Sequence, residues 1–278
     1  MAVEHPLKGQ VALVTGGGRG LGRAYAEALV GAGAFVAVVA RTASQVDESA
    51  ARITAAGGRA RAYSLDVTDT GAVKRMVADI ERDLGPVALL VNAAGAADPL
   101  GPLAECDPDE WWHGVEINAK GPYLCTRFVL PGMIARGAGR IVNVSSGVGT
   151  RSYDYLSSYC VGKTALIRLT ECVAAETASR GIRVFSISPG MVRTDMNRLL
   201  VGHPKSAEWF PWAAETLSKG KDFPPEASTR LLLRLARGEA DALSGRHISV
   251  AEDLDALIAR AAEAAEQQAL MLRLSALA

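Results

Sequence analysis

The sequence has little of what secreted and metal-binding proteins are built from. It contains four cysteines in 278 residues, at Cys106, Cys125, Cys160 and Cys172, with no Cys-x-x-Cys pair among them. Neither a disulfide framework nor a thiolate zinc site is therefore predicted. The four histidines include no pair at the spacing that puts two ligands on one helix face. We expect a reduced, cytoplasmic chain that holds no metal.

Net charge and long apolar runs are also absent. Thirty Lys and Arg residues balance thirty Asp and Glu residues, which leaves no long-range field to attract nucleic acid or an anionic membrane. No apolar run reaches the roughly 18 residues that span a bilayer, and the N-terminus lacks a cationic flank followed by an apolar stretch. The sequence predicts a soluble chain with a small-molecule partner, no nucleic acid and no membrane.

What the sequence does contain is an alternation of short β-branched runs and longer helical patterns. The runs lie at residues 11–15, 35–40, 61–65, 87–92, 140–145, 182–188 and 246–250. The helical patterns between the earlier runs begin near Gly20, Ser44, Asp69, Asp107 and Leu156. Strands that alternate with helices form βαβ units, and near-continuous apolar strands are buried on both faces. The predicted fold is α/β, a doubly wound parallel sheet of about seven strands with helices on both faces.

The chain is predicted to be one domain with an extension. Residues 1–250 would form the sheet domain, and 251–278 a C-terminal helix from Glu252 onward, packed on the domain or on a neighbouring subunit. Within the domain, residues 195–225 carry four prolines and several aromatic residues. This segment is expected to be a long irregular excursion, either a functional loop or core filler.

A glycine-rich turn, TGGGRGLG, follows the first strand directly. Glycines at this place let backbone N–H groups and a helix N-terminus approach a pyrophosphate. The pattern Gly-x-Gly-x-x-Gly is met at no register, and a triphosphate P-loop is excluded because Arg23-Ala24 stands where Lys and Ser/Thr are required. The turn instead fits Thr-Gly-x-x-x-Gly-x-Gly, with Gly16, Gly20 and Gly22 as its fixed points; a plain tight turn is the alternative.

No acidic residue stands between Glu27 and Asp47, where NAD-binding proteins carry the carboxylate that binds the ribose 2′-OH. Arg41 lies just past the second strand with Ala40 in the place of the acid, and Arg19 lies in the glycine-rich turn. Two guanidinium groups would hold a 2′-phosphate that a carboxylate would repel. NADP(H) is therefore favoured as the cofactor, with NAD(H) as the alternative.

The stretch YCVGK places Tyr159 and Lys163 four positions apart, one turn of a helix. Alone, such a pair is ordinary on a protein surface. The preceding strand, however, ends in Ser145 and Ser146 at the carboxyl edge of the sheet, where open α/β folds bind ligands. Asn118 lies on the long helix before that strand. Together they suggest a catalytic constellation, although Ser146 could merely end a strand and Asn118 could merely satisfy backbone groups.

Taken together, these motifs resemble the short-chain dehydrogenase/reductase family over about residues 7–196. The matching segments are TGxxxGxG at Thr15–Gly22, an NNAG-type motif at Asn92–Gly95, and SPGMVRTDM at Ser188–Met196. The tetrad would be Asn118, Ser146, Tyr159 and Lys163, since the family's serine usually precedes its tyrosine by thirteen residues; Ser145 is the rival. Ala93 in the NNAG-type motif departs from the family, as do about thirty residues beyond Ile248.

The resemblance implies a Rossmann-type fold, a homo-oligomer that is a tetramer or a dimer, and an NAD(P)-dependent oxidoreductase that interconverts a secondary alcohol and a ketone. It places Asp66 against the adenine and Thr194 near the nicotinamide carboxamide. The implied cofactor-binding residues are Thr15, Gly16, Gly18, Arg19, Gly20, Leu21, Gly22, Arg41, Thr42, Asp66, Val67, Asn92, Ala93, Ala94, Gly95, Tyr159, Lys163, Pro189, Gly190, Val192 and Thr194.

The chemistry also follows from the residues. A free phenol, with a pKa near 10, exchanges its proton poorly at pH 7, and a nearby cation lowers that pKa. We therefore expect Lys163, with the positive charge added by the oxidised nicotinamide, to lower the pKa of Tyr159, the acid in reduction and the base in oxidation. Ser146 would hydrogen-bond the substrate oxygen. By resemblance, Lys163 would hold the nicotinamide ribose hydroxyls and Asn118 would support a water-linked proton path.

The substrate is less closely specified. Tyr153 and Tyr155, together with Trp209, Phe210 and Trp212, predict an apolar, aromatic or alicyclic alcohol or ketone, because pocket linings are mostly hydrophobic. Two other functions stay open. A non-redox epimerase or dehydratase with a tightly held cofactor would keep the tyrosine and lysine, whereas a dinucleotide-sensing protein would keep only the glycine-rich turn.

Overall fold

Seven strands form one parallel sheet in the computed structural model, which describes residues 5–273. In the order β3-β2-β1-β4-β5-β6-β7 they are Arg59–Ser64, Phe35–Ala40, Val11–Thr15, Val87–Asn92, Gly139–Val144, Ile182–Ser188 and His247–Ser249. All six neighbouring pairs are parallel. The predicted doubly wound parallel α/β fold is confirmed, and β3 begins two residues earlier than its sequence pattern indicated.

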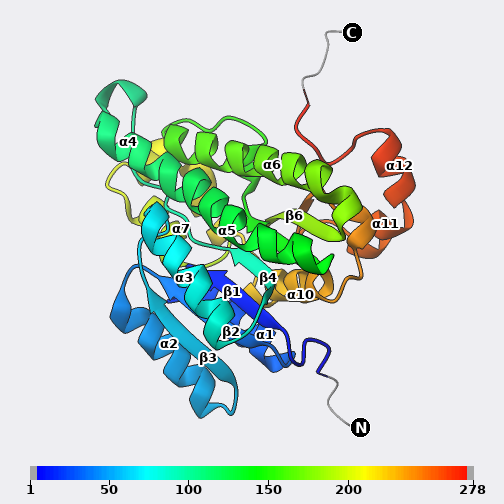
Figure 1. The fold of residues 1–278 in the computed structure, drawn as a ribbon. Helices are drawn as coiled ribbons and strands as arrows, with labels where there is room; N and C mark the ends of the chain where they lie inside the picture. The colour runs from blue at the N-terminus through cyan, green and yellow to red at the C-terminus, as the bar shows by residue number, and fades with distance from the viewer. Residues whose placement is uncertain (1–4, 274–278) are drawn as a thin grey trace.

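Helices cover both faces of the sheet (Figure 1). One face carries α1 (Gly20–Gly31), α2 (Ala43–Ala55) and α10 (Pro225–Ala236), and the other carries α3 (Thr70–Asp83), α5 (Gly121–Arg136) and α6 (Ser157–Thr177). The inner strands are mostly apolar because alternate side chains enter the two cores: Ala12 and Val14 of β1 face α1, whereas Val11 and Leu13 face α3 and α5. The edge strand β3 is partly exposed and carries Arg59 and Arg61. Within residues 5–273 no helix is both long and apolar enough to cross a membrane.

The helix predicted around Asn118 is interrupted. α4 (Pro108–Val115) is capped by Asp107, whose carboxylate accepts from the backbone N–H groups of the first turn, and a π-helical turn (Glu116–Lys120) joins it to α5. Asn118 lies in this turn and donates from Nδ2 to the carbonyl oxygens of Gly114 at 2.8 Å and Ala96 at 2.7 Å. The wider turn therefore places its side chain against the loop after β4. Short 3₁₀ turns lie at Leu103–Glu105, Gly147–Gly149, Ala178–Arg180 and Asp241–Leu243.

The segment after β6 is not irregular, so that expectation is wrong. It folds into α7 (Asp195–Gly202), α8 (Ser206–Trp209) and α9 (Pro211–Ser218). The prolines and caps separate these helices rather than prevent them, since Pro211 occupies the first turn of α9. The two ends of the segment meet: Phe223 N donates to Met191 O at 2.8 Å, and Arg193 pairs with Asp222 at 2.6 Å. We call residues 191–223 the lid.

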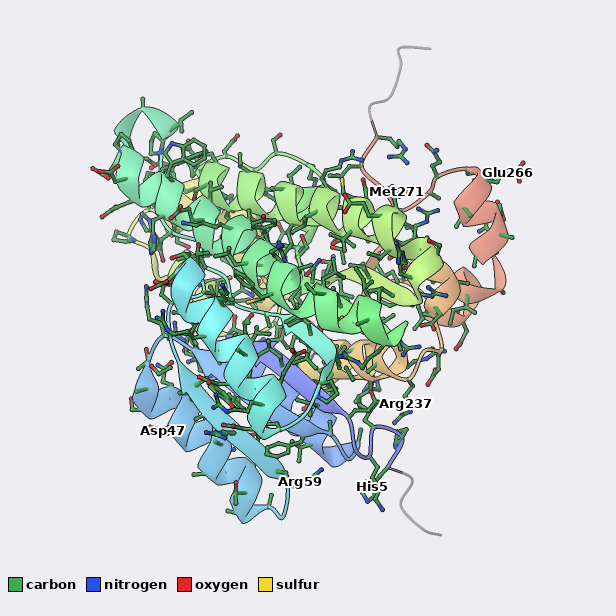
Figure 2. The ribbon with its side chains drawn as sticks, in the orientation of Figure 1. His5, Asp47, Arg59, Arg237, Glu266 and Met271 are labelled. Carbon is green, nitrogen blue, oxygen red and sulfur yellow. The ribbon has the colours of Figure 1, made fainter. Side chains whose placement is uncertain are left out.

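The C-terminal extension packs on its own domain, but not as one helix. It forms α11 (Leu254–Ala259) and α12 (Ala261–Glu266), with Leu254 and Ala261 buried in the same core as α10. The chain then passes the outer edge of β7, where His247 N donates to Leu270 O at 2.9 Å. Figure 2 labels Glu266 and Met271 on this segment. Residues 1–4 of the predicted domain and 274–278 of the extension lie outside the described residues.

One buried carboxylate ties this segment to α6. Glu171 Oε1 accepts from Leu272 N at 2.7 Å, and its other oxygen pairs with Arg168, which also donates to Leu272 O at 2.8 Å. The Glu171 side chain is 4% exposed. A buried charge of this kind stabilises the fold only because all its partners are in place.

We predict that Glu171→Gln lowers the free energy of unfolding by about 1–2 kcal/mol, because the hydrogen bonds lose their charge assistance. Glu176→Gln, at an exposed position on the same helix, is the matched control and should stay within about 0.5 kcal/mol of the wild type. Urea denaturation measures both. Equal effects of the two substitutions would contradict this role for Glu171.

Candidate active site

The segments singled out in the sequence meet at one edge of the sheet. The glycine-rich turn follows β1, Asn92–Gly95 closes β4, Ser145 and Ser146 follow β5, and Pro189 follows β6. Because these four strands are parallel neighbours, their carboxyl ends lie side by side. The strand order also reverses between β1 and β4, which is where open sheets of this kind bind ligands.

The glycine-rich turn is shaped by contacts that side chains would prevent. Gly16 and Gly20 have φ of +68° and +53°, the left-handed region that favours glycine. A Cβ on Gly16 would lie 2.8 Å from Ala94 N, and one on Gly22 would collide with the carbonyl oxygen of Gly16. No side chain therefore covers the backbone N–H groups at the N-terminus of α1. Such a helix N-terminus fits the phosphates of a dinucleotide.

Neighbouring side chains hold this turn from behind. The carbonyl oxygen of Gly18 accepts from Arg23 at 2.6 Å and from Ser49 Oγ at 3.1 Å. Thr15 Oγ1 accepts from the backbone N–H groups of Ala93 and Ala94, both at 3.1 Å, and so joins the ends of β1 and β4. Sequence reasoning missed Arg23 and Ser49 as supports of the turn, because no local spacing links Ser49 to it.

The two arginines predicted to select the cofactor differ in their ion pairing. Arg41 is exposed after β2 and lines a cavity of about 830 Å³. Arg19 is 62% exposed but paired, its Nη1 lying 3.1 Å from Asp195 Oδ2 of the lid. Burial alone would raise the pKa of Asp66, but hydrogen bonds from Thr68 outweigh it and lower that pKa below its ordinary value.

The other predicted cofactor residues lie in the loops and first helical turns at the same edge of the sheet. Thr42 precedes α2 at its N-cap position without a side-chain capping hydrogen bond, Val67 is buried against Gly121, and Leu21 is half-buried in the first turn of α1. After β6, Gly190 has φ of +69°, Val192 is buried and Thr194 caps α7. Thr194 also approaches the glycine-rich turn, since its Cγ2 is 3.8 Å from where a Cβ on Gly20 would be.

The structure brings the four predicted tetrad residues together. Lys163 Nζ lies 5.6 Å from the centre of the Tyr159 ring, and Ser146 is within hydrogen-bonding reach of the Tyr159 hydroxyl. A Cβ on Gly95 would be 2.9 Å from Asn118 Oδ1 and 3.2 Å from Lys163 Nζ. Gly95 therefore keeps open the space that the amide and the ammonium share.

The two adjacent serines face different ways. Ser145 is buried and donates from Oγ to the carbonyl oxygen of Lys163 at 3.1 Å. Ser146 is half-buried, and its Oγ accepts from Val148 N at 3.4 Å at the start of a 3₁₀ turn. Of the two serines, Ser146 is the one that lowers the pKa of Tyr159, while the Ser145 hydroxyl is taken up by the Lys163 carbonyl, which favours Ser146 over its rival.

Burial shifts the pKa values of Tyr159 and Lys163 toward their uncharged forms. Desolvation raises the pKa of Tyr159 to about 12, against a smaller lowering by the hydrogen bond from Ser146. Desolvation also lowers the pKa of Lys163 to about 7. In the chain alone Lys163 does not lower the pKa of Tyr159, because the lysine is itself buried; the lowering by the oxidised nicotinamide stays a prediction.

Asn118 is buried, and its side-chain amide holds two backbone segments together. Its Nδ2 joins the π-helical turn to the loop after β4, and its Oδ1 has no hydrogen-bond partner among the described residues. Lys163 Nζ donates instead to Val144 O at 2.8 Å. The water-linked proton path through Asn118 stays a prediction.

The predicted substrate residues form one aromatic cluster between the lid and the loop after β5. Tyr155 stacks on Trp209 with ring centres 4.8 Å apart, and Trp209 stacks on His203 at 4.7 Å. Tyr153 lies 5.2 Å from Trp212. Trp209 is only 9% exposed, which makes it chiefly a packing residue. Phe210 is fully buried in the same cluster.

The cavity of about 830 Å³ lies beside α7 of the lid. Its walls come from Arg41, the loop after β4, α4 and α7. His113 of α4 and Arg198 of α7 line it, and sequence reasoning singled out neither. A single histidine or arginine on a helix does not indicate a site in the sequence, because the cavity forms only where that helix packs beside other elements. Among the described residues no group of three or more His, Cys, Asp or Glu side chains could hold a metal.

Comparison with known proteins assigns the family. The family model described as short chain dehydrogenase matches residues 10–203. The chain belongs to this family. A short chain dehydrogenase of Pseudocercospora fijiensis is 34% identical over 275 residues, covering 92% of this chain and 84% of the relative. A 3-oxoacyl-[acyl-carrier-protein] reductase of Vibrio harveyi is 34% identical over 245 residues, covering 88% of this chain and 96% of the relative.

Solved structures of short chain dehydrogenases share the fold. A protein named as an NAD(P)-dependent gluconate 5-dehydrogenase, from Beutenbergia cavernae and with NADP bound, has a TM-score of 0.80 at 29% identity, over 88% of this chain and 96% of that one. An NAD⁺-bound xylitol dehydrogenase has a TM-score of 0.82 at 27% identity, over 87% and 98%. The family resemblance seen in the motifs is thus confirmed, and the chain is an oxidoreductase of this family.

The burial of Lys163 predicts a pH-dependent stability. Since its pKa falls from 10.5 to about 7 on folding, the unfolded chain binds more protons between those values, and wild-type stability rises with pH in that window. Lys163→Met lacks this dependence. Its stability relative to the wild type should therefore be highest near pH 7 and fall by up to about 1.4 kcal/mol per pH unit toward pH 10.

Urea denaturation at each pH measures this difference. Lys74→Met, at an exposed position on α3, is the control and should keep a constant difference from the wild type. Curves for Lys163→Met and the wild type that stay parallel from pH 7 to 10 would show that Lys163 keeps an ordinary pKa.

Proposed function

We propose that the protein is an NAD(P)-dependent oxidoreductase that interconverts a secondary alcohol and a ketone, with NADP(H) as the favoured cofactor. The observation that carries the proposal is the convergence of Ser146, Tyr159 and Lys163 at the carboxyl edge of the sheet, beside a glycine-rich turn that fits a dinucleotide. A sensor of dinucleotides has no use for a half-buried phenol beside a serine and a lysine.

The residues supply acid–base chemistry at one oxygen atom. A bound NADP(H) would deliver the hydride to the carbonyl carbon or take it from the alcohol. The Tyr159 phenol gives its proton to the substrate oxygen in reduction and takes it back in oxidation. Ser146 donates a hydrogen bond to the same oxygen and shares the charge that develops there. Burial raises the pKa of Tyr159 to about 12 in the chain alone, so the phenol is protonated at neutral pH, and a positive charge beside it would ease the release of that proton.

Charge supports the choice of cofactor. Arg41 is exposed beside the cleft, Arg19 stands in the turn, and Ala40 offers no carboxylate to a ribose hydroxyl. A 2′-phosphate gains from both guanidinium groups, whereas NADH has nothing comparable to bind them. The relative with NADP bound and the one with NAD⁺ bound support cofactors of this class.

Apolar side chains support the proposed substrate class. Tyr153, Tyr155 and Trp212 are half-buried between the lid and the loop that carries Ser146. Flat aromatic surfaces suit an aromatic or alicyclic ketone better than a highly hydroxylated one. A homo-oligomer, also proposed, would cover the exposed Trp112 of α4 and the exposed Val161 of α6.

Adjacent serines allow a matched test of the catalytic assignment. We predict that Ser146→Ala lowers kcat by about 10²- to 10³-fold, and that Tyr159→Phe lowers kcat to near background, both with NADPH affinity within about threefold of the wild type. Ser145→Ala should act mainly on stability, because its hydroxyl holds the Lys163 carbonyl. NADPH oxidation with a panel of aromatic and alicyclic ketones measures kcat, and fluorescence titration measures affinity.

The outcomes separate the rival functions. Turnover with no net change in nicotinamide absorbance would indicate a non-redox epimerase or dehydratase. Intact activity in Tyr159→Phe, or a larger loss in Ser145→Ala than in Ser146→Ala, would overturn the assignment of these residues.

Arg41→Ala tests the cofactor preference. We predict that it weakens NADPH binding by about tenfold or more, because a charge-assisted contact with the 2′-phosphate is lost, while NADH binding changes little. Arg75→Ala, at an exposed position on α3, is the control and should change neither affinity. Energy transfer from tryptophan to the reduced nicotinamide reports binding. Tighter binding of NADH than NADPH by the wild type would reverse the proposed preference.

A further inference from the structure

Asp195 joins two arginines from different parts of the chain. It is the first residue of α7, its Oδ2 lies 3.1 Å from Nη1 of Arg19 in the glycine-rich turn, and its Oδ1 lies 3.1 Å from Nη1 of Arg198. Each carboxylate oxygen is thus taken by one guanidinium group. Asp195 and Arg19 are 176 positions apart, so the contact exists only because the lid rests on the turn.

Asp195 lies among other charged residues. Asp195 and Arg198 line the same cavity as Arg41, Asp98 and Glu110. Thr194, the preceding residue, packs on Gly20. The lid that carries Asp195 is closed at its base by Arg193 and Asp222, so α7 is anchored as part of one folded unit.

We propose that Asp195 is an internal anion that occupies the guanidinium of Arg19 until the 2′-phosphate of NADP(H) replaces it, and that Asp195 thereby sets the preference between NADP(H) and NAD(H). The inference rests on the proposed cofactor site. It adds a specificity-determining residue on the lid, next to Thr194 in the segment Ser188–Met196 but not among the predicted cofactor-binding residues.

The strength of the contacts allows the exchange. The side chains of Arg19 and Asp195 are 62% and 48% exposed, and ion pairs exposed to this degree shift an equilibrium by up to about fivefold. A phosphate carries nearly two negative charges and binds guanidinium groups through paired hydrogen bonds. It therefore displaces a single carboxylate, whereas NADH, which has no 2′-phosphate, leaves Asp195 in place.

The test is the affinity of Asp195→Asn for NADPH and NADH, measured by fluorescence titration at one ionic strength. We expect NADPH to bind about two- to fivefold more tightly than to the wild type, with little change for NADH. Glu110→Gln is the matched control. Glu110 lines the same cavity but forms no ion pair with an arginine among the described residues, so its loss should alter neither affinity.

A double-mutant cycle ties the effect to Arg19. In an Arg19→Ala background, Asp195→Asn should no longer tighten NADPH binding, because its partner is gone. Unchanged or weaker NADPH binding by Asp195→Asn would overturn the inference, the latter by showing that Asp195 orients Arg19 for the phosphate. The same gain with and without Arg19 would overturn it too. A wild type that binds neither nucleotide would instead refute the proposed function, and this inference with it.

Discussion

The parallel pairing of β1, β4, β5 and β6 is the constraint on which the rest of the molecule depends. Parallel strands are joined by crossovers, here helices on both faces, which bury the inner strands and make them mostly apolar. They also bring four carboxyl ends to one edge. The glycine-rich turn, the loop that carries Ser146 and the base of the lid meet there, although they are far apart along the chain.

The same burial sets the chemistry of the site. Lys163 is 3% exposed, with its ammonium donating to the Val144 carbonyl at the end of β5. Desolvation disfavours charge on both members of the pair, so it raises the pKa of Tyr159 and lowers that of Lys163. In the chain alone Tyr159 therefore holds its proton, whereas Lys163 gives up its proton near neutral pH.

The lid connects this edge of the sheet to the nucleotide cleft through charge and through packing. Its aromatic residues stack with Tyr155 on the substrate side, and Asp195 pairs with Arg19 on the cofactor side. The base of the lid is closed by a backbone hydrogen bond and an ion pair. A single folded segment thus contacts both places where the proposed ligands would bind, which gives the two sites a physical means to influence each other.

The sequence alone determined the order of strands and helices, the glycine-rich turn and the Tyr159–Lys163 pair, because periodicity, glycine positions and helical spacing are local properties of a chain. It also indicated Ser146 through its separation from Tyr159. Local patterns did not foresee the helices of the lid, the division of the C-terminal helix at Arg260, or the pairing of Asp195 with Arg19. Only the tertiary structure decided these features and the direction in which the pKa of Tyr159 moves, because burial and long-range ion pairs arise when distant segments exclude water from one another.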